Sequence, residues 1–305
     1  LKFIGGDGTL WGLNYNLAYF IEVMWESDNT NIYPLIGGYK ITNCEFQKAY
    51  FCICTIYTCG PSIIGGNEMS GNRFLDTEAG VSVMDLDNSC SITSYNFFER
   101  VHWLGVMDWQ GVYADPNTLK LSKFIVSNNC IGLNSYTTGG EAFTVGINPV
   151  DYGIFAGNST ESKMDVVVSN NKVQINDIGY GGIIPQDLKN PVIINNLVCG
   201  TGTTGIGAGF WTKPPDYTEY DQESGYLIKG NNVKGMDASV APIWLGPGTS
   251  NFLVYADKKD VLDEGTNNTV VGDHNKRSGH PGPEFREKMM LKYEFMKSHN
   301  HKGMK

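Results

Sequence analysis

The sequence predicts an all-β chain folded as a parallel β-helix, a solenoid of about eight or nine coils, with a short C-terminal α-helix. A phrase of Asn, any residue and an apolar residue recurs just after short β-branched runs, as in Asn171-Lys172-Val173. It returns every 24 to 42 residues, a period typical of solenoids and propellers. The units are rich in Val, Ile, Thr and Tyr and are bounded by Gly, Asn, Asp and Pro, which favours strands. The repeated Asn stands at eight positions: Asn43, Asn72, Asn96, Asn129, Asn171, Asn196, Asn231 and Asn268.

The repeated Asn predicts an internal asparagine ladder. An amide side chain at the same turn of every coil can hydrogen-bond the coils above and below it, and Asn tolerates the left-handed backbone of a tight corner. The alternative is an ordinary β-sandwich in which Asn-Asn pairs only mark turns. A sandwich does not require the same apolar phase after each Asn, so the recurring phase favours the β-helix.

A second phrase, Gly-apolar-any-apolar, occurs at Gly80-Val81-Ser82-Val83. With these two phrases, residues 39–272 resemble the right-handed parallel β-helix superfamily, the pectate-lyase-like group of sugar-active repeat proteins. The resemblance implies a right-handed coil and a polysaccharide ligand. Such phrases identify the architecture better than they identify an activity.

The 305 residues divide into three predicted parts. Residues 1–38 are expected to form an irregular first coil or a cap over the open end of the stack. Residues 39–272 form the β-helix. Residues 273–305 are a polar linker followed by a helical tail, because Pro283 suits a first helical turn and Phe285 and Met289 share one helical side.

Charge and cysteine content bound the partners and the compartment. The net charge of −9 argues against nucleic acid, and no apolar run reaches the roughly 18 residues of a membrane span. The seven Cys lack a strong zinc-binding spacing and are expected to be mostly small buried residues. A sugar-active β-helix is expected to be secreted or at the cell surface, whereas unpaired Cys leave a cytoplasmic location open.

Long insertions are the places where a repeat scaffold usually carries its function. Three are predicted, at residues 108–117, 148–163 and 211–221. The 42-residue step between Asn129 and Asn171 could instead hide a degenerate coil around Asn148.

Two acidic residues stand at equivalent places in neighbouring coils. Val83-Met84-Asp85 and Val106-Met107-Asp108 are 23 residues apart, so stacked coils would put Asp85 beside Asp108. Carboxylates that close repel each other. The pair therefore predicts a Ca²⁺ site made by Asp85, Asp87 and Asp108, or an acid with a base or nucleophile for glycoside cleavage. The alternative is that these Asp are solvated strand ends.

The same alignment places tryptophans along one flank of the stack, with tyrosines on the loops beside them. Flat aromatic rings with polar neighbours hold sugars by stacking on the apolar face of the sugar ring. The alternative is that these Trp cover coil ends or pack under loops. The predicted sugar-binding residues are Trp109, Tyr113, Trp211, Tyr217, Tyr220 and Trp244.

Arg100 and His102 lie on the strand that leads to Asp108. In the β-helix lyases that the chain resembles, an Arg or Lys removes the proton next to a uronate carboxylate while Ca²⁺ holds that carboxylate. The resemblance therefore implies Arg100, His102 or Lys163 as the base. The chain departs from the family here. It lacks the Arg-x-Pro-x-x-Arg phrase of pectate lyases, and it does not contain the polygalacturonase set of Asn-Thr-Asp, Asp-Asp, Gly-His-Gly and Arg-x-Lys phrases.

Two functions follow from these observations. The first is a protein that binds or cleaves polysaccharide, as a lyase or a glycoside hydrolase, with Asp85, Asp108, Arg100 and His102 as the catalytic set. The second is a noncatalytic surface, adhesive or assembly protein built on a β-helix scaffold. The second function predicts self-association through residues 211–221 or through the C-terminal tail.

Overall fold

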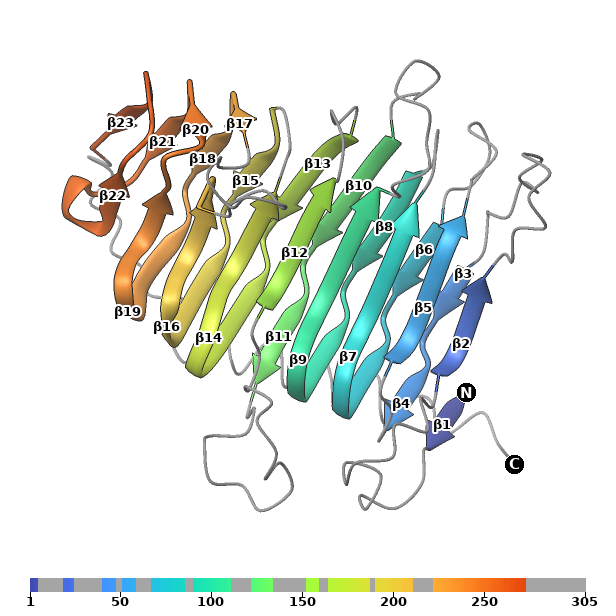
Figure 1. Cartoon of the computed structure of the whole chain (residues 1–305). Helices are drawn as coiled ribbons and strands as arrows, with labels where there is room; N and C mark the ends of the chain where they lie inside the picture. Colours follow the sequence, from blue (N-terminus) through green and yellow to red (C-terminus); the bar gives the residue numbers. More distant parts are fainter. Residues whose placement is uncertain are drawn as a thin grey trace, which may run out of the picture. The chain divides into compact units, whose positions relative to one another are not determined.

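Parallel strands form nearly all of the regular structure in the part of the chain that the computed structural model describes (Figure 1). The described residues are 1–4, 19–24, 40–47, 51–58, 67–85, 90–110, 122–133, 152–158, 164–186, 190–210 and 222–272. They belong to one unit, Leu1–Gly272. Neighbouring strands are parallel in both large sheets, which excludes the antiparallel sandwich.

The larger sheet contains 12 strands, and most of its central members are 12 to 15 residues long. Its strands are β1 (Lys2–Ile4), β2 (Tyr19–Met24), β4 (Glu45–Gln47), β5 (Phe51–Thr58), β7 (Arg73–Asp85), β9 (Phe97–Gln110), β11 (Cys130–Leu133), β12 (Tyr152–Asn158), β14 (Lys172–Gln186), β16 (Leu197–Ala208), β19 (Asn232–Leu245) and β22 (Val261–Asp263). The long strands bend, and the register shifts inside them at points such as Thr77/Ala79 and Gly202/Thr204.

The smaller sheet contains nine short strands, one for each coil. They are β3 (Lys40–Thr42), β6 (Asn67–Ser70), β8 (Cys90–Ser94), β10 (Ser122–Ser127), β13 (Met164–Ser169), β15 (Val192–Ile194), β18 (Leu227–Lys229), β21 (Leu253–Tyr255) and β23 (Thr269–Val271). We number the coils one to nine by these strands. The predicted parallel β-helix of eight or nine coils is confirmed, and its right hand stays a prediction.

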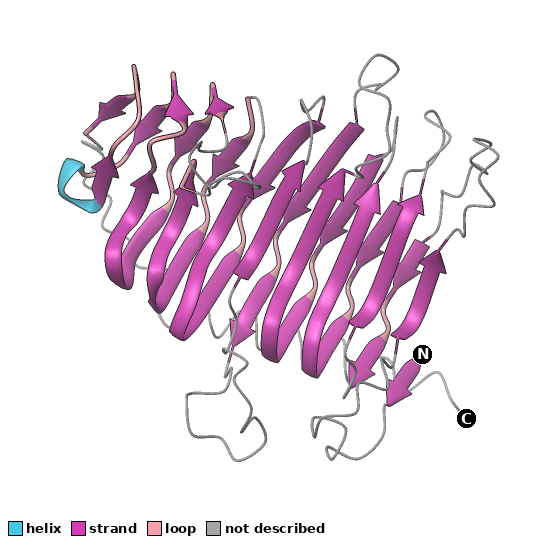
Figure 2. Cartoon of the chain, viewed as in Figure 1, coloured by secondary structure: helices cyan, strands magenta, loops and turns pink. Residues whose placement is uncertain are grey.

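The remaining regular elements are small. Strands β17 (Glu223–Ser224) and β20 (Thr249–Ser250) pair with each other, and η2 (Lys258–Asp260) is a short 3-10 helix (Figure 2). Within the described residues, no helix is both long and apolar enough to cross a membrane. The predicted C-terminal helix, with the rest of residues 273–305, lies outside the described residues.

The asparagine ladder joins consecutive coils at the corner between the two large sheets. The Oδ1 atom of Asn171 accepts hydrogen bonds from the backbone N–H and the Nδ2 of Asn129, both at 3.0 Å. The Nδ2 of Asn171 donates to the Val126 carbonyl at 2.9 Å and to the Asn196 Oδ1 at 3.0 Å. Backbone N–H groups donate in the same way along the whole ladder, which contains Asn72, Asn96, Asn129, Asn171, Asn196 and Asn231.

The residue before each ladder position has a left-handed backbone. Asn128, Asn170 and Asn195 have φ of 58°, 55° and 56°, and Gly71 and Gly230 occupy the equivalent places. This conformation costs an ordinary L-residue about 1–2 kcal/mol, which Gly avoids and Asn offsets in part. In each Asn-Asn pair, the first Asn forms the left-handed corner and the second Asn forms the hydrogen bonds of the ladder.

The predicted ladder is wrong at both ends. Asn43 is a corner residue with φ of 55°, and the ladder place in the first coil belongs to Cys44, whose backbone N–H donates to Asn72 Oδ1 at 2.9 Å. Asn268 belongs to a different corner, where its Oδ1 accepts from the backbone N–H of Phe252 at 2.9 Å. That second corner immediately precedes the strands of the smaller sheet. Tyr226 and Phe252 lie at this corner in neighbouring coils, and their rings stack with centroids 4.1 Å apart.

The 42-residue step contains no additional coil. Asn129 and Asn171 are hydrogen-bonded to each other and therefore lie in adjacent coils. Strands β11 and β12 both belong to that one coil, because each pairs with β9 on one side and β14 on the other. The extra length is an insertion between these two strands, and the expectation of a degenerate coil around Asn148 is wrong.

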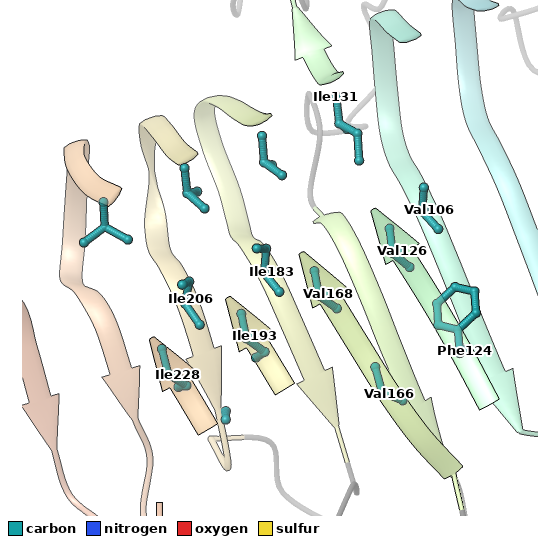
Figure 3. Close-up of a cluster of buried hydrophobic side chains, with 14 of the residues drawn as sticks. Val106, Phe124, Val126, Ile131, Val166, Val168, Ile183, Ile193, Ile206 and Ile228 are labelled. Carbon is teal, nitrogen blue, oxygen red and sulfur yellow. The ribbon is translucent and has the colours of Figure 1, made fainter. Parts of the chain in front are cut away.

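The core fills the space inside the coils with columns of apolar side chains (Figure 3). Short strands alternate buried and half-buried residues, so Phe124 and Val126 point inward while Ile125 between them does not. At the N-terminal end the rings of Phe46, Phe74 and Phe98 stack from coil to coil with centroids 5.2 and 4.5 Å apart. Each coil therefore covers the apolar side chains of the next one.

Candidate functional site

Three side chains meet over Gly207 on the outer side of the 12-stranded sheet. Ile206 and Ala208 belong to the buried core, so Gly207 between them faces outward. A Cβ atom at Gly207 would lie 2.6 Å from Thr204 Cγ2, 2.8 Å from Phe210 Cε1 and 3.3 Å from Ile184 Cδ1. Only a glycine leaves room for the ring of Phe210 this close to the sheet.

Trp244 lies in register with Gly207 on the next strand, β19. Its ring stacks on Phe210 with centroids 4.5 Å apart and an interplanar angle of 10°. Its Nε1–H donates to Glu264 Oε2 at 2.8 Å, which fixes the orientation of the indole. Both rings are partly exposed. We name Ile184, Gly207, Phe210, Trp244 and Glu264 the outer aromatic cluster.

The outer aromatic cluster presents an oriented aromatic ring next to a carboxylate. Glu264 is exposed, as is Asp263 before it, whose Oδ1 accepts from Gly265 N–H at 3.1 Å and from Asn268 Nδ2 at 2.8 Å. An aromatic face beside hydrogen-bond acceptors is suited to the apolar face and the hydroxyl groups of a sugar. The cluster contains Trp244, one of the predicted sugar-binding residues.

The predicted pairing of Asp85 with Asp108 is wrong. Asp85 is in register with Gln110, and Asp108 is in register with Val83. The offset between β7 and β9 is 24 residues at Arg73 and Phe97 and becomes 25 after the shift at Thr77/Ala79, whereas the prediction assumed 23. The two Asp are therefore displaced by two residues along the strands.

Asp108 also falls in a row of small and apolar residues. On its other side it is in register with Ala156, which is in register with the buried Pro185. Asp87, the third predicted Ca²⁺ ligand, lies outside the described residues. Among the residues that the structure describes, no three His, Cys, Asp or Glu side chains gather as a metal site.

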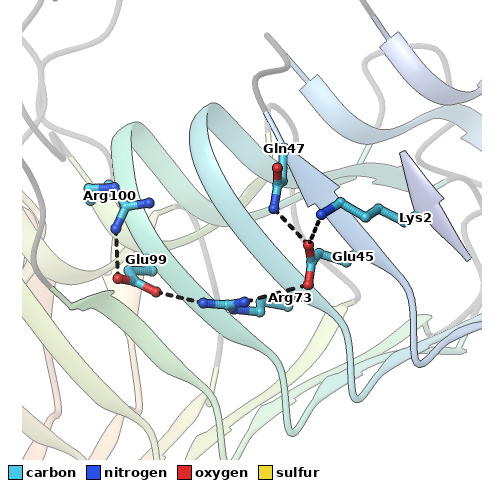
Figure 4. Close-up of polar contacts among 6 residues, drawn as sticks. All are labelled: Lys2, Glu45, Gln47, Arg73, Glu99 and Arg100. Atoms are coloured by element: carbon cyan, nitrogen blue, oxygen red, sulfur yellow. Dashed lines mark hydrogen bonds and ion pairs between the residues drawn. The ribbon is translucent and has the colours of Figure 1, made fainter. Parts of the chain in front are cut away.

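Arg100, a predicted base, belongs to a chain of ion pairs (Figure 4). Its Nη1 lies 2.7 Å from Glu99 Oε1, and Glu99 Oε2 lies 3.1 Å from Arg73 Nη2. Glu45 continues the chain, at 3.5 Å from Arg73 and 3.0 Å from Lys2. This contact links Arg100 through Glu99 to Arg73.

Glu45 shows the electrostatic effect of this ion-pair chain. Burial alone raises the pKa of its carboxyl group, but the hydrogen bond from Lys2 and the positive charges of Lys2 and Arg73 outweigh burial. The net result is a pKa below the ordinary value. The chain connects strands β1, β4, β7 and β9 across the outer side of the sheet.

The other predicted site residues are only partly placed. His102 lies in β9, between Val101, which pairs with Thr77, and Leu104, which pairs with Ala79. Trp109 pairs with Met84 and Gly157, so its row is not the row of Trp244. Residues 113, 211, 217 and 220 lie outside the described residues.

The predicted sugar-binding residues do not include four members of the outer aromatic cluster, Ile184, Gly207, Phe210 and Glu264. Glu264 is 20 residues from Trp244 and meets it only because the coil returns. A glycine between two apolar residues at Gly207 was the available signal, since a bare position beneath an aromatic pair permits close packing.

Comparison with protein-family models, with curated proteins and with solved structures gave no match.

Proposed function

We propose that this chain is a polysaccharide-binding β-helix protein that holds its ligand at the outer aromatic cluster. The observation that carries the proposal is the indole of Trp244, which is stacked on Phe210, fixed by Glu264 and still partly exposed. A pre-oriented aromatic ring loses little entropy when a sugar ring stacks against it. Consecutive coils beside the cluster offer a long surface to a polymer.

The charges around the cluster favour a neutral polysaccharide. Glu264 and Asp263 are both exposed, and the chain carries a net charge of −9. A polyuronate would be repelled unless a cation such as Ca²⁺ lay between the carboxylates. Neutral hydroxyl groups can instead donate hydrogen bonds to Glu264.

Native affinity electrophoresis tests this proposal with mixed-linkage glucan, xylan and galactomannan as neutral polymers and polygalacturonate as an acidic one. We expect at least one neutral polymer to retard the protein, and Trp244→Ala to weaken binding about tenfold through loss of the stacking surface. Tyr95→Asn is the matched control, because it removes an exposed aromatic ring outside the cluster. Equal retardation of Trp244→Ala and the unmodified chain would refute the site.

Cleavage of the polysaccharide is the second part of the proposal. The resemblance to pectate-lyase-like proteins implies a right-handed coil. It also implies Ca²⁺ as a possible cofactor. Asp108→Asn should then abolish the release of reducing ends from the polysaccharide that binds best, while the melting temperature is kept. Unchanged turnover would exclude Asp108 from catalysis. A protein of this function would be secreted or displayed at the cell surface.

A noncatalytic scaffold protein is the second candidate function. Two observations favour it: Asp85 and Asp108 are out of register, and Arg100 is engaged by Glu99. This candidate predicts no turnover of any polysaccharide by the unmodified chain. Binding without turnover would leave the outer aromatic cluster as an adhesive site.

A further inference from the structure

The two edges of strand β19 are paired over very different lengths. The edge that faces β16 is paired from Asn232 to Leu245. The opposite edge is paired with β22 only from Ile243 to Leu245, as Figure 1 shows at the arrowhead end of β19. In the described part of the chain, no strand lies beside residues 232–242 on that side.

The gap arises because coil eight is shorter than coil seven. Lys229 is in register with Tyr255, and Ile243 is in register with Val261. Thirteen residues separate Lys229 from Ile243, but only five separate Tyr255 from Val261, including the turn η2. Coil eight therefore lacks about eight residues of strand. The turn η2 also contacts β19. We name the edge of residues 232–242, which no described strand pairs with, the β19 notch.

The side chains of the β19 notch alternate as in a strand at the edge of a sheet. Val233 is buried, and Met236 is partly buried against the core. Lys234 and Asp237 are exposed, and Val240 is 41% exposed. The notch therefore has apolar positions toward the core and one charge of each sign toward solvent.

A strand edge of this kind selects an extended polypeptide. Its backbone N–H and C=O groups recur at the spacing of another strand, and the other coils satisfy them with a parallel neighbour about 4.8 Å away. A glycan is a poor occupant, because residues 232–242 contain no aromatic side chain. We propose that the β19 notch binds an extended peptide segment of about eight residues as an added parallel strand.

The outer side of the same sheet indicates the charges that the segment should carry. Lys2, Glu45 and Arg73 are in register in consecutive strands and alternate in sign. The same rule at the notch places an acidic residue beside Lys234 and a basic residue beside Asp237. Apolar residues of the peptide should lie beside Val233 and Met236, with their side chains toward the core.

The test uses two fluorescein-labelled peptides of equal composition. The first is Val-Glu-Thr-Val-Arg-Val-Thr-Val, and the second exchanges its Glu and Arg. Fluorescence anisotropy should show about tenfold tighter binding of the first peptide by the unmodified chain, because two attractive pairs replace two repulsive ones. The double variant Lys234→Glu/Asp237→Lys should reverse the preference, and hydrogen exchange should show protection of amides within residues 232–242 when the first peptide binds.

Lys123→Glu is the matched control, because Lys123 is an exposed lysine on the other large sheet, and this variant should keep the original preference. Equal binding of both peptides, or a preference that the double variant leaves unchanged, would overturn the proposal. Light scattering on the protein alone gives a further check. A dimer that the double variant dissociates would show that a second copy of this chain occupies the notch, and would also overturn it.

Discussion

The asparagine ladder makes the sharpest prediction about stability, at Asn170 and Asn171. Asn171→Ala removes four side-chain hydrogen bonds, which join Asn171 to Val126, Asn196 and, twice, Asn129. The site is 2% exposed, so water cannot replace them without opening the coil. At about 0.5–1.5 kcal/mol for each bond, the expected loss is about 2–6 kcal/mol of the free energy of unfolding. That is a large part of the roughly 5–15 kcal/mol typical of a folded domain.

The adjacent residue provides the matched control. Asn170 is exposed and has φ of 55°, a conformation that Gly adopts without strain and that Gly71 and Gly230 adopt at equivalent corners. We therefore expect Asn170→Gly to change the free energy of unfolding by less than about 1 kcal/mol. Urea denaturation followed by circular dichroism measures both variants. The reasoning fails if Asn171→Ala stays within about 0.5 kcal/mol of the unmodified chain, or if the two variants lose equal stability.

Three further predictions concern the charges, a strained corner and a thiol. The pKa of Glu45 is lowered, so its contribution to stability is complete above its ordinary pKa of 4.5 and is lost as the pH falls through the lowered value. In thermal melts, Glu45→Gln should therefore flatten the loss of stability that accompanies a fall in pH below 4.5. Tyr95 has φ of 57° at a corner where Asn or Gly is usual, so Tyr95→Asn should raise the free energy of unfolding by about 0.5–1 kcal/mol; a decrease in urea denaturation would contradict the strain argument. Burial raises the pKa of the Cys130 thiol to about 11, so iodoacetamide at pH 8 should leave Cys130 unmodified in the folded protein. Mass spectrometry measures the labelling. Fast labelling of Cys130 would show that the coil opens there.

The ladder was predictable from the sequence because its chemistry is local. A buried Asn after a left-handed corner leaves an Asn-Asn or Gly-Asn signature in most coils, with Tyr95-Asn96 as an exception. Asn129, Asn171 and Asn196 were placed correctly. The two errors have physical reasons. At the first coil a backbone N–H alone is sufficient for Asn72 Oδ1, and at Asn268 the same amide chemistry serves a different corner.

The register was not predictable to the residue. The bulge at Thr77/Ala79 adds one residue without a sequence signature, and it accounts for one of the two residues by which Asp85 and Asp108 are displaced. The other residue comes from the offset of 24 before the bulge, where the prediction assumed 23. An insertion between two strands has the length of an additional coil, so the step from Asn129 to Asn171 could not be interpreted by counting. The hydrogen bonds between these two Asn and the pairing of β10 with β13 show that their coils are adjacent.

The candidate site was predicted in part for the same reason. Trp244 was predicted to bind sugar as one of the tryptophans along one flank of the stack. Its partners Gly207 and Glu264 come from other coils. Contacts between coils depend on the register, which small bulges change. The sequence could therefore indicate the outer side of the larger sheet but could not assemble the cluster.

The most direct test of the proposed function is a crystal structure of the chain soaked with an oligosaccharide of the neutral polymer that binds best in electrophoresis. Our account predicts a sugar ring stacked on the exposed part of Trp244 with a hydroxyl group donating to Glu264. A sugar bound elsewhere, with Trp244 and Phe210 unoccupied at a saturating concentration, would contradict it.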